Sequence, residues 1–234
     1  MVLRDTATGG AHLAFGAAGA PALVAHDDSA PTFAPPARAC AGSLVTARMT
    51  AREWHAAWWQ ADAEGNAALA TARSTDGGEQ WSAPVIADAR DRSGEGCTRP
   101  PPSIATDSVT GYVHLAYFLR PAEGAGVWYT HSMDRGASWH STAAMIYGDD
   151  PARTAVGVAG ALLVVAYESP NARVRRVGVA LSRSAGHSFG ERLRASGGDV
   201  AATHPLAAVR GRAFAVGWSE PAGRIVGRVG VVRD

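Results

Sequence analysis

The sequence contains no lysine, so arginine supplies all 22 basic side chains of its 234 residues. Together with abundant alanine and glycine, we interpret this as the composition of a GC-rich genome, such as many bacteria have, rather than as a functional adaptation. The 21 acidic residues nearly balance the arginines and leave a formal net charge of +1. Such a balance gives no reason to expect a polyanion recruited by bulk charge, so no nucleic-acid partner is predicted.

Long apolar runs are also absent. No stretch of about 18 apolar residues occurs, which predicts no membrane span and no membrane partner. The first residues, Met1–Asp5, lead straight into repeat sequence, so we expect no signal peptide in this chain. The sequence leaves the compartment open.

Cysteine is scarce, and two residues are too few for a disulfide scaffold or a zinc cage. We therefore predict no metal and no cofactor. Cys40 and Cys97 lie 57 positions apart, close to the repeat spacing described below. A disulfide between them requires Cα atoms within about 7 Å. The alternative, two unpaired buried thiols, is the one we favour.

Apolar residues with helical spacing are lacking over any long segment, so helix is expected to be nearly absent. Short β-rich runs that end in an aromatic residue take their place, as in Trp54–Trp58, Leu163–Tyr167 and Phe214–Trp218. Two longer segments, Asp5–Phe15 and Asp107–Tyr117, share six identical residues in eleven. These similarities indicate an internal repeat.

An octapeptide marks the repeat most clearly. Ser74–Trp81 and Ser132–Trp139 both fit the pattern Ser-x-Asp-x-Gly-x-x-Trp, and Ser182–Phe189 fits it with Ser184 at the Asp position. His26–Phe33 keeps only the Asp and the aromatic residue. Successive octapeptides start 48, 58 and 50 residues apart. A repeat at such a period predicts stacked units of supersecondary structure.

Each repeat is expected to form four strands, with the octapeptide in the turn between the third and the fourth. For the third repeat the expected strands are Ser103–Thr106, Val113–Leu119, Val127–Ser132 and Ala143–Tyr147. Four-stranded antiparallel sheets repeating every 50 residues or so are the units of a β-propeller. We predict an all-β propeller of five repeats in one domain, 1–234. Val232–Asp234 stands where a fifth octapeptide would begin, so the last repeat is incomplete. Its sheet either lacks the outer strand or receives it from another segment, and the chain forms either five blades or a five-repeat piece of a larger ring. The incomplete repeat predicts self-association, by either swapping or pairing of chains.

The octapeptides resemble the Asp-boxes (BNR repeats) of the sialidase, or neuraminidase, superfamily, and the resemblance covers essentially the whole chain. It implies a propeller whose boxes lie opposite the active site. The box residues are therefore expected to be structural. They are Ser74, Asp76, Gly78, Trp81, Ser132, Asp134, Gly136 and Trp139.

Charged residues are expected on the opposite face, at the ends of the inner strands. Those placed just before the first strands of successive repeats are Arg38, Arg99, Arg153 and His204; those just after the second strands are Arg120, Glu168 and Glu220. Several guanidinium groups converging on the axis would suit a carboxylate or phosphate. We predict ligand binding by the arginines and His204, with Glu168 and Glu220 as candidate acid-base residues. The alternative is a solvated rim of ordinary surface ion pairs.

Three functions follow as hypotheses. The first is a binding module for an anionic ligand, most plausibly an acidic glycan. The second is a sialidase-type glycoside hydrolase, since the resemblance implies an arginine triad with a Tyr nucleophile; Arg99–Ile104 is the nearest match to the family's Arg-Ile-Pro segment, and Arg38 and Arg153 would complete the triad. The third is a structural or assembly propeller without a small-molecule site.

The remaining aromatic and histidine side chains are expected to be packing residues. His12, His55 and His114 occupy like places in second strands, where different repeats keep them too far apart for a metal. Trp54, Trp58 and Trp59 invite an interpretation as a sugar platform. Their side chains alternate between the two faces of a strand, however, so we expect them to fill the space between sheets.

Overall fold

The computed structural model describes the backbone of residues 12–15 and 21–24, residue 33, and residues 38–233. The degenerate octapeptide at positions 26–33 lies outside the described residues except for Phe33. The first-repeat segment before residue 12 and the side chain of His12 lie outside them too.

Four-stranded antiparallel sheets repeat along the chain. They comprise β3 (Val45–Arg48), β4 (Trp54–Ala61), β5 (Ala67–Ser74) and β6 (Val85–Asp88); β7 (Ser103–Asp107), β8 (Tyr112–Leu119), β9 (Gly126–Ser132) and β10 (Ala143–Tyr147); and β11 (Thr154–Ala159), β12 (Leu162–Glu168), β13 (Val177–Ser182) and β14 (Glu191–Arg194). A sheet of β15 (Thr203–Arg210), β16 (Ala213–Glu220) and β17 (Arg224–Val231) has three strands, and β1 (His12–Phe15) pairs with β2 (Pro21–Val24). Strands neighbouring in sequence are neighbours in each sheet, so every sheet is a meander.

The strands expected in the third repeat are confirmed to within one residue at each end. The octapeptides begin at the last residue of β5, β9 and β13 and span the turn to the next strand, as expected. Helix is limited, among the described residues, to two three-residue 3₁₀ turns, η1 (Gly96–Thr98) and η2 (Pro221–Gly223). None of the helices found there is long and apolar enough to cross a membrane.

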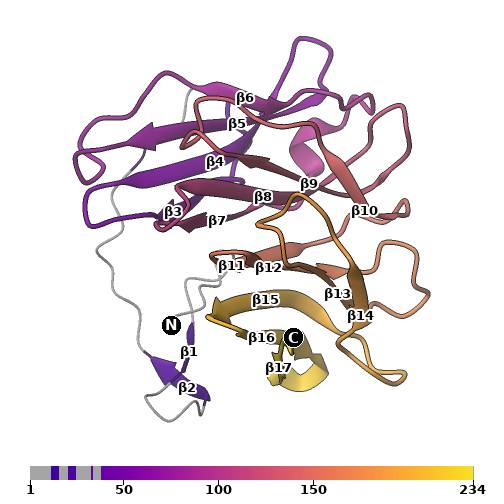
Figure 1. Cartoon of the computed structure of the whole chain (residues 1–234). Coiled ribbons are helices and arrows are strands. Elements are labelled where there is room, and N and C mark those ends of the chain that lie inside the picture. Colours follow the sequence, from indigo (N-terminus) through magenta and orange to yellow (C-terminus); the bar gives the residue numbers. More distant parts are fainter. Residues whose placement is uncertain (1–11, 16–20, 25–32, 34–37, 234) are drawn as a thin grey trace.

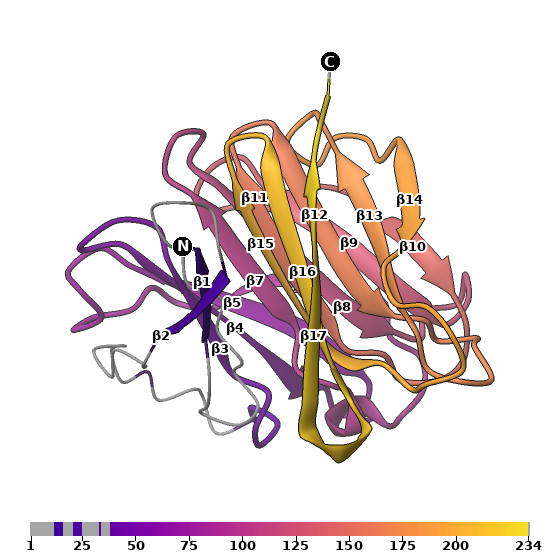
Figure 2. The same cartoon turned by 90° about the horizontal axis from the view of Figure 1, so that it is seen from below.

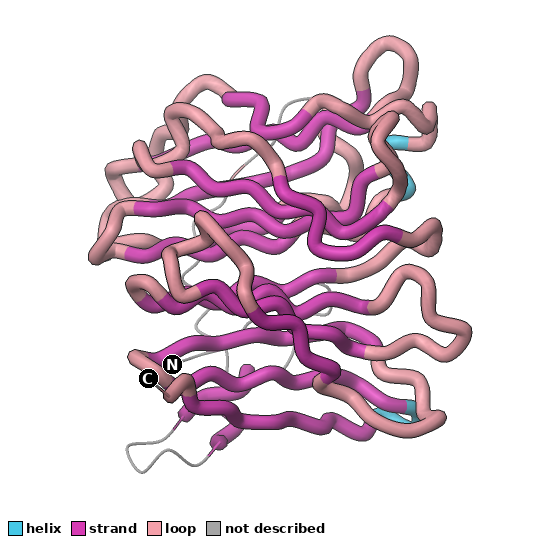
Figure 3. The backbone as a smooth tube through the Cα atoms, turned by 45° about the vertical axis from the view of Figure 1, so that its right-hand side comes forward, coloured by secondary structure: helices cyan, strands magenta, loops and turns pink. Residues whose placement is uncertain are grey.

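The sheets stack face to face as a fan, with loops gathered at the two ends of the strands (Figures 1 and 3). Seen from below, β17 lies in front of β16 and of the sheets behind it (Figure 2). The first strands form the inner edge, where β3 contacts β7, β7 contacts β11, and β11 contacts β15. Antiparallel sheets stacked in this way, with the middle sheets covered on both faces, are the architecture of a propeller.

Apolar side chains from facing sheets fill each gap between them. Trp58 and Trp59 are both fully buried but contribute to different clusters, one on each face of their sheet. Trp59 meets Tyr117 of the next sheet edge to face at 5.7 Å, and Trp58 packs against Phe33. Large buried aromatics dominate core energetics, so these tryptophans serve packing, as their alternation predicts.

The expectation of two unpaired thiols is wrong, because Cys40 and Cys97 form a disulfide with a Cα–Cα distance of 5.1 Å. Cys97 lies in η1, which folds back onto the preceding sheet. The amide of Gly96 donates to the carbonyl of Gly65 at 2.8 Å. The loop before β7 thus places Cys97 beside Cys40, which the repeat spacing alone did not reveal.

Candidate functional site

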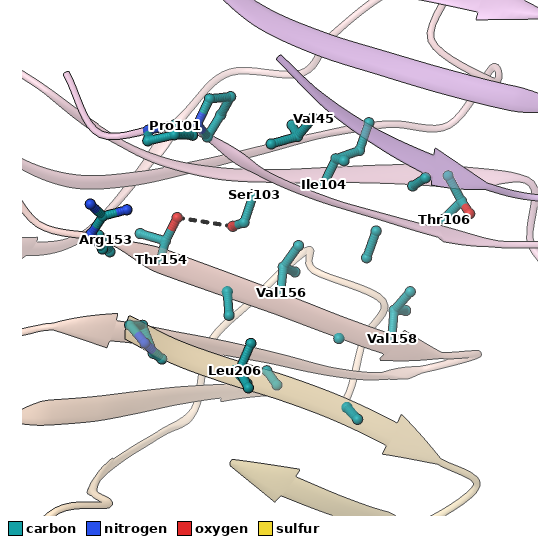
Figure 4. Close-up of a pocket in the computed structure, with 18 of the residues that line it drawn as sticks. Val45, Pro101, Ser103, Ile104, Thr106, Arg153, Thr154, Val156, Val158 and Leu206 are labelled. Carbon is teal, nitrogen blue, oxygen red and sulfur yellow. Dashed lines mark hydrogen bonds between the residues drawn. The ribbon is translucent and has the colours of Figure 1, made fainter. Parts of the chain in front are cut away.

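A cavity of about 300 Å³ lies along the inner edge of the fan and is lined by the first strands β3, β7, β11 and β15. Its middle is apolar and is lined by Val45, Ile104, Val156, Val158 and Leu206 (Figure 4). Its charged side chains lie towards its two ends, as do Ser103, Thr154 and Thr106, and Thr46 stands beside Val45. We call the end that carries Arg153 and His204 the mouth; it is opposite the octapeptide turns.

Hydroxyl groups and a guanidinium group surround the mouth. Ser103 and Thr154 come from neighbouring first strands, and their hydroxyl oxygens lie 2.9 Å apart (Figure 4). Both are within hydrogen-bond distance of the carbonyl of Ala116. Arg153 directly precedes β11, is half-buried and forms no ion pair or side-chain hydrogen bond with any described residue. The mouth therefore presents an unneutralised positive charge.

His204 adopts a backbone conformation that a non-glycine residue rarely takes, with φ of 53°. It precedes Pro205, and the pairing of β15 with β16 shifts register between Thr203 and Leu206. Bulges of this kind re-aim side chains and are common near functional sites, and such strain costs on the order of 1–3 kcal/mol. The bulge places His204 among the residues that line the cavity.

Glu168 holds these two residues in place through their backbones. Its carboxylate accepts hydrogen bonds from the amide of His204 at 2.9 Å and from the amide of Arg153 at 3.3 Å. The guanidinium of Arg175 adds an ion pair at 2.9 Å. Glu168 is only 3% exposed. Both of its oxygens are occupied, so its role is to link the starts of β11 and β15.

Arg99 does not reach the cavity, although it precedes a first strand like Arg153. Its side chain is fully buried and pairs with the buried Asp91 at 2.6 Å. Burial alone would raise the pKa of Asp91, but the amide of Ala67 and the guanidinium of Arg99 hold that pKa below its ordinary value. Pro100–Pro102 separate Arg99 from β7, and this spacer takes it away from the inner edge.

Arg120 and Arg38 also lie away from the cavity lining. Arg120 donates to the carbonyl of Asp149 at 2.9 Å, and its guanidinium lies near the ring of Phe118, as does that of Arg99. Arg38 is exposed beside the isolated bridge that joins Ala39 to Gln60. Of the four positions expected to converge, the structure brings together Arg153 and His204.

Glu220 is bound within its own hairpin. It accepts the indole N–H of Trp218 at 3.0 Å and the Nε–H of Arg224 at 2.9 Å. The hydrogen bond from Trp218 and the ion pair with Arg224 lower the pKa of Glu220. Neither acid-base candidate therefore faces the cavity with a free carboxylate.

The octapeptide turns are closed by their own side chains. In the 132–139 turn, Ser132 Oγ donates to Asp134 at 2.7 Å and accepts the amide of Gly136 at 2.7 Å, while the amide of Ser138 donates to Asp134 at 2.8 Å. The 74–81 turn repeats this network. In the 182–189 turn Ser184 takes the Asp role, accepting the amide of Ser188 at 3.0 Å. Such groups bind their own backbone rather than a ligand.

Half of the eight histidines gather beside these turns, which the sequence did not reveal. They are His114, His131, His140 and His187. The ring of His131 stacks on that of His140 at 4.7 Å and meets that of His187 at 4.8 Å. The register that pairs β8 with β9 places His114 opposite His131, so an alignment of that hairpin would have shown the first pair. Across residues 38–233, no group of three or more His, Cys, Asp or Glu is arranged to hold a metal ion.

The part of the cavity lining that the structure describes carries neither a carboxylate nor a phenol. Among the described residues that line it there is no Asp, no Glu and no Tyr. Glycoside hydrolases commonly use two carboxylates or, in sialidases, a Tyr nucleophile. The arrangement can hold an anion at the mouth through Arg153 and His204, next to the apolar middle of the cavity.

Solved structures of carbohydrate-active enzymes are similar to this fold. The Hadza microbial sialidase Hz136 has 15% identity and a TM-score of 0.59, over 80% of this chain and 44% of that one. The α-L-arabinofuranosidase Arb93A of Fusarium graminearum has 14% identity and a TM-score of 0.58, over 86% and 66%. The α-L-arabinanase of Penicillium chrysogenum has 14% identity and a TM-score of 0.56, over 84% and 65%.

This chain thus spans from 44% to 66% of the length of these three neighbours. No protein-family model matches the sequence, and no curated protein matches it. Identities this low show the fold alone. In its fold, the chain is similar to the propeller-type, sialidase-like carbohydrate-active enzymes.

Proposed function

We propose that this protein is a binding module for an anionic ligand, an acidic glycan, held at the mouth of the cavity by Arg153 and His204. The observation that carries the proposal is the unpaired guanidinium of Arg153 at the mouth of a cavity whose described lining has no carboxylate. A planar guanidinium binds a carboxylate bidentately. The imidazole of His204 adds a second donor, and Ser103 and Thr154 offer oxygen lone pairs to sugar hydroxyls.

Binding without hydrolysis is favoured by the chemistry of the two glutamates. Glu168 is saturated by three N–H donors, and Glu220 is bound by Trp218 and Arg224. The fold similarity to a sialidase supports the second candidate, a sialidase-type hydrolase. That candidate requires carboxylates and a Tyr from outside the described lining. A purely structural propeller, the third candidate, leaves the strained His204 and the unpaired Arg153 without a role.

The architecture belongs to the same proposal. We assign the 74–81 and 132–139 turns as Asp-boxes, since their hydrogen-bond networks agree and both lie opposite the mouth. The sheets are assigned as blades of a five-repeat propeller in one domain. On this assignment the mouth lies on the propeller axis, where loops from several blades meet.

A glycan array with sialylated, uronic-acid-containing and neutral glycans tests the proposal. We expect the wild-type protein to bind the acidic glycans on the array. Arg153→Ala should lower the affinity for these glycans at least tenfold. Arg52→Ala is the matched control, because Arg52 is an exposed arginine at the turn end. Hydrolysis of a fluorogenic sialoside by the wild type would favour the hydrolase, and an array without signal would favour the structural propeller.

A further inference from the structure

The last sheet differs from the others at its third strand. β5, β9 and β13 hold the third place in their sheets, and most of their residues are buried. In β17, the strand in the same place, six of eight residues are exposed and none is buried. β17 pairs with β16 and with no other described strand. Its outer edge therefore presents backbone groups that no described strand satisfies.

One face of β17 is apolar and open to solvent. Ile225, Val229 and Val231 are 53%, 59% and 63% exposed, and their odd-numbered spacing puts them on the same face. On the opposite face Val226 packs against the cluster shared with β11, β12 and β13. The strand has no proline and carries no charge on its apolar face. A long, apolar, unprotected edge strand is a template for pairing with another chain.

We propose that β17 pairs antiparallel with β17 of a second copy of this chain, about a two-fold axis that passes beside Gly227. In this register Ile225 lies opposite the partner's Val229, and Gly227 lies opposite the partner's Gly227. Arg224 lies opposite the partner's Gly230, and Arg228 opposite the partner's Val226. Two three-stranded sheets then form one continuous six-stranded sheet, and the two edges satisfy each other.

Charge selects this register from its symmetric neighbours. An axis beside Arg228 would put the two Arg228 side chains directly opposite each other. An axis beside Val226 would put Arg224 opposite the partner's Arg228. Like charges directly opposite are destabilising in a sheet, whereas apolar cross-strand pairs stabilise it. Of these three, the register centred on Gly227 joins apolar residues and separates the arginines.

Cysteine cross-linking tests the register. Cys40 and Cys97 are bonded to each other, so Gly227→Cys adds the single free thiol. A Cβ at Gly227 meets its nearest neighbour, the carbonyl oxygen of Val216, at 3.4 Å, an ordinary contact. Directly opposite Cα atoms in antiparallel strands lie about 4.5–5.5 Å apart, within disulfide range. We expect most of the variant to run as a dimer on a non-reducing gel after mild oxidation.

Gly190→Cys is the control, since it puts an equally unobstructed thiol elsewhere, before β14. It should remain monomeric on the same gel. Equal cross-linking of the two variants, or none of either, contradicts the proposed pairing.

Light scattering tests the association without a new thiol. The wild type should be a dimer, and Val229→Arg should raise its dissociation constant at least tenfold, because the new charge lies opposite the partner's Ile225. Val109→Arg adds the same charge at a valine that is 86% exposed, in the turn after β7, and should leave the dimer intact. Circular dichroism spectra that match the wild type show that both variants are folded.

A wild type that is monomeric across the accessible concentrations overturns the proposal. If the amides of β17 in that monomer also exchange slowly with deuterium, residues of the same chain cover the edge. Neither outcome bears on Arg153, so the proposed ligand site and the proposed pairing can fail separately.

Discussion

The two ends of the strands differ in how their polar groups are satisfied. At the turn end, Ser132 and Asp134 bind the amides of their own turn, and the 74–81 and 182–189 turns do the same. At the mouth end, the side chain of Arg153 has no hydrogen-bond or ion-pair partner among the described residues. His204 is held there in a strained backbone conformation. The polar groups at the turn end bind one another, whereas the mouth end carries a charge without a counter-charge among the described residues.

On the proposed function, the difference separates residues that maintain the fold from residues that bind the ligand. Position along the chain does not decide whether an arginine is available to a ligand. Arg99 precedes a first strand as Arg153 does, and yet its side chain is buried in an ion pair with Asp91. What matters is whether the structure already supplies a counter-charge. Changes at closed sites should therefore cost stability, and changes at the open site should cost binding.

Acidification should lower the stability of the protein more than any substitution below. It acts through buried histidines near the turn end of the strands. Burial lowers the pKa of His55 to about 4 and that of His114 to about 3, with His131 likewise at about 4. The unfolded chain binds these protons near pH 6.5, so stability should fall as the pH drops from about 6.5 towards 4. The combined loss is on the order of several kcal/mol. Urea unfolding at a series of pH values measures it, and a flat profile over this window would contradict buried neutral histidines.

Removing Arg99 should have the next largest effect. Arg99→Ala leaves Asp91 buried without its cation, which typically costs about 3–5 kcal/mol. Arg153→Ala should change stability by no more than about 0.5 kcal/mol, as for most surface substitutions. Urea midpoints of the two variants give the comparison directly. Equal losses would mean that the two arginines do not differ as the structure indicates.

Reducing the disulfide should lower the free energy of unfolding somewhat less than Arg99→Ala does. The Cys40–Cys97 bond closes a long loop, and such bonds contribute about 2–4 kcal/mol, mainly by constraining the unfolded chain. We expect a lower thermal midpoint in the presence of a reductant, and the same midpoint for Cys40→Ala/Cys97→Ala. Insensitivity of the midpoint to reductant would show that the two thiols are unpaired.

A single turn should contribute least. Asp134→Ala removes the bonds from Ser132 and Ser138, at a cost of about 1–2 kcal/mol. Asp134→Ser should recover part of this loss, because Ser184 accepts the equivalent amide in the 182–189 turn. Thermal midpoints of the two variants measure the difference. Midpoints of both variants equal to that of the wild type would show that the carboxylate and hydroxyl of the turn do not contribute to stability.

Periodic features of the fold could be predicted from the sequence, since the octapeptide and the aromatic-ended runs recur at fixed spacing. The strands of residues 103–147 and the buried, alternating Trp58 and Trp59 follow from those patterns alone. Local hydrogen bonding and side-chain alternation determine both, so no knowledge of distant contacts is needed.

Features that depend on contacts between loops could not be predicted in this way. The pairing of Cys40 with Cys97 depends on how η1 folds back, and the burial of Arg99 depends on Asp91 and on Pro100–Pro102. The bulge that aims His204 into the cavity breaks the strand register. Each feature departs from the repeat, and the prediction of the fold rested on the repeat spacing.

The measurement that tests the central claim most directly is calorimetric titration of the wild type and of Arg153→Ala. The two ligands are an acidic glycan and the neutral glycan in which its carboxyl group has been reduced to an alcohol. We expect the wild type to bind the acidic form at least tenfold more tightly, and Arg153→Ala to lose that preference at unchanged stability. Equal affinity of wild type and variant for the acidic glycan would show that the mouth of the cavity is not the anion site.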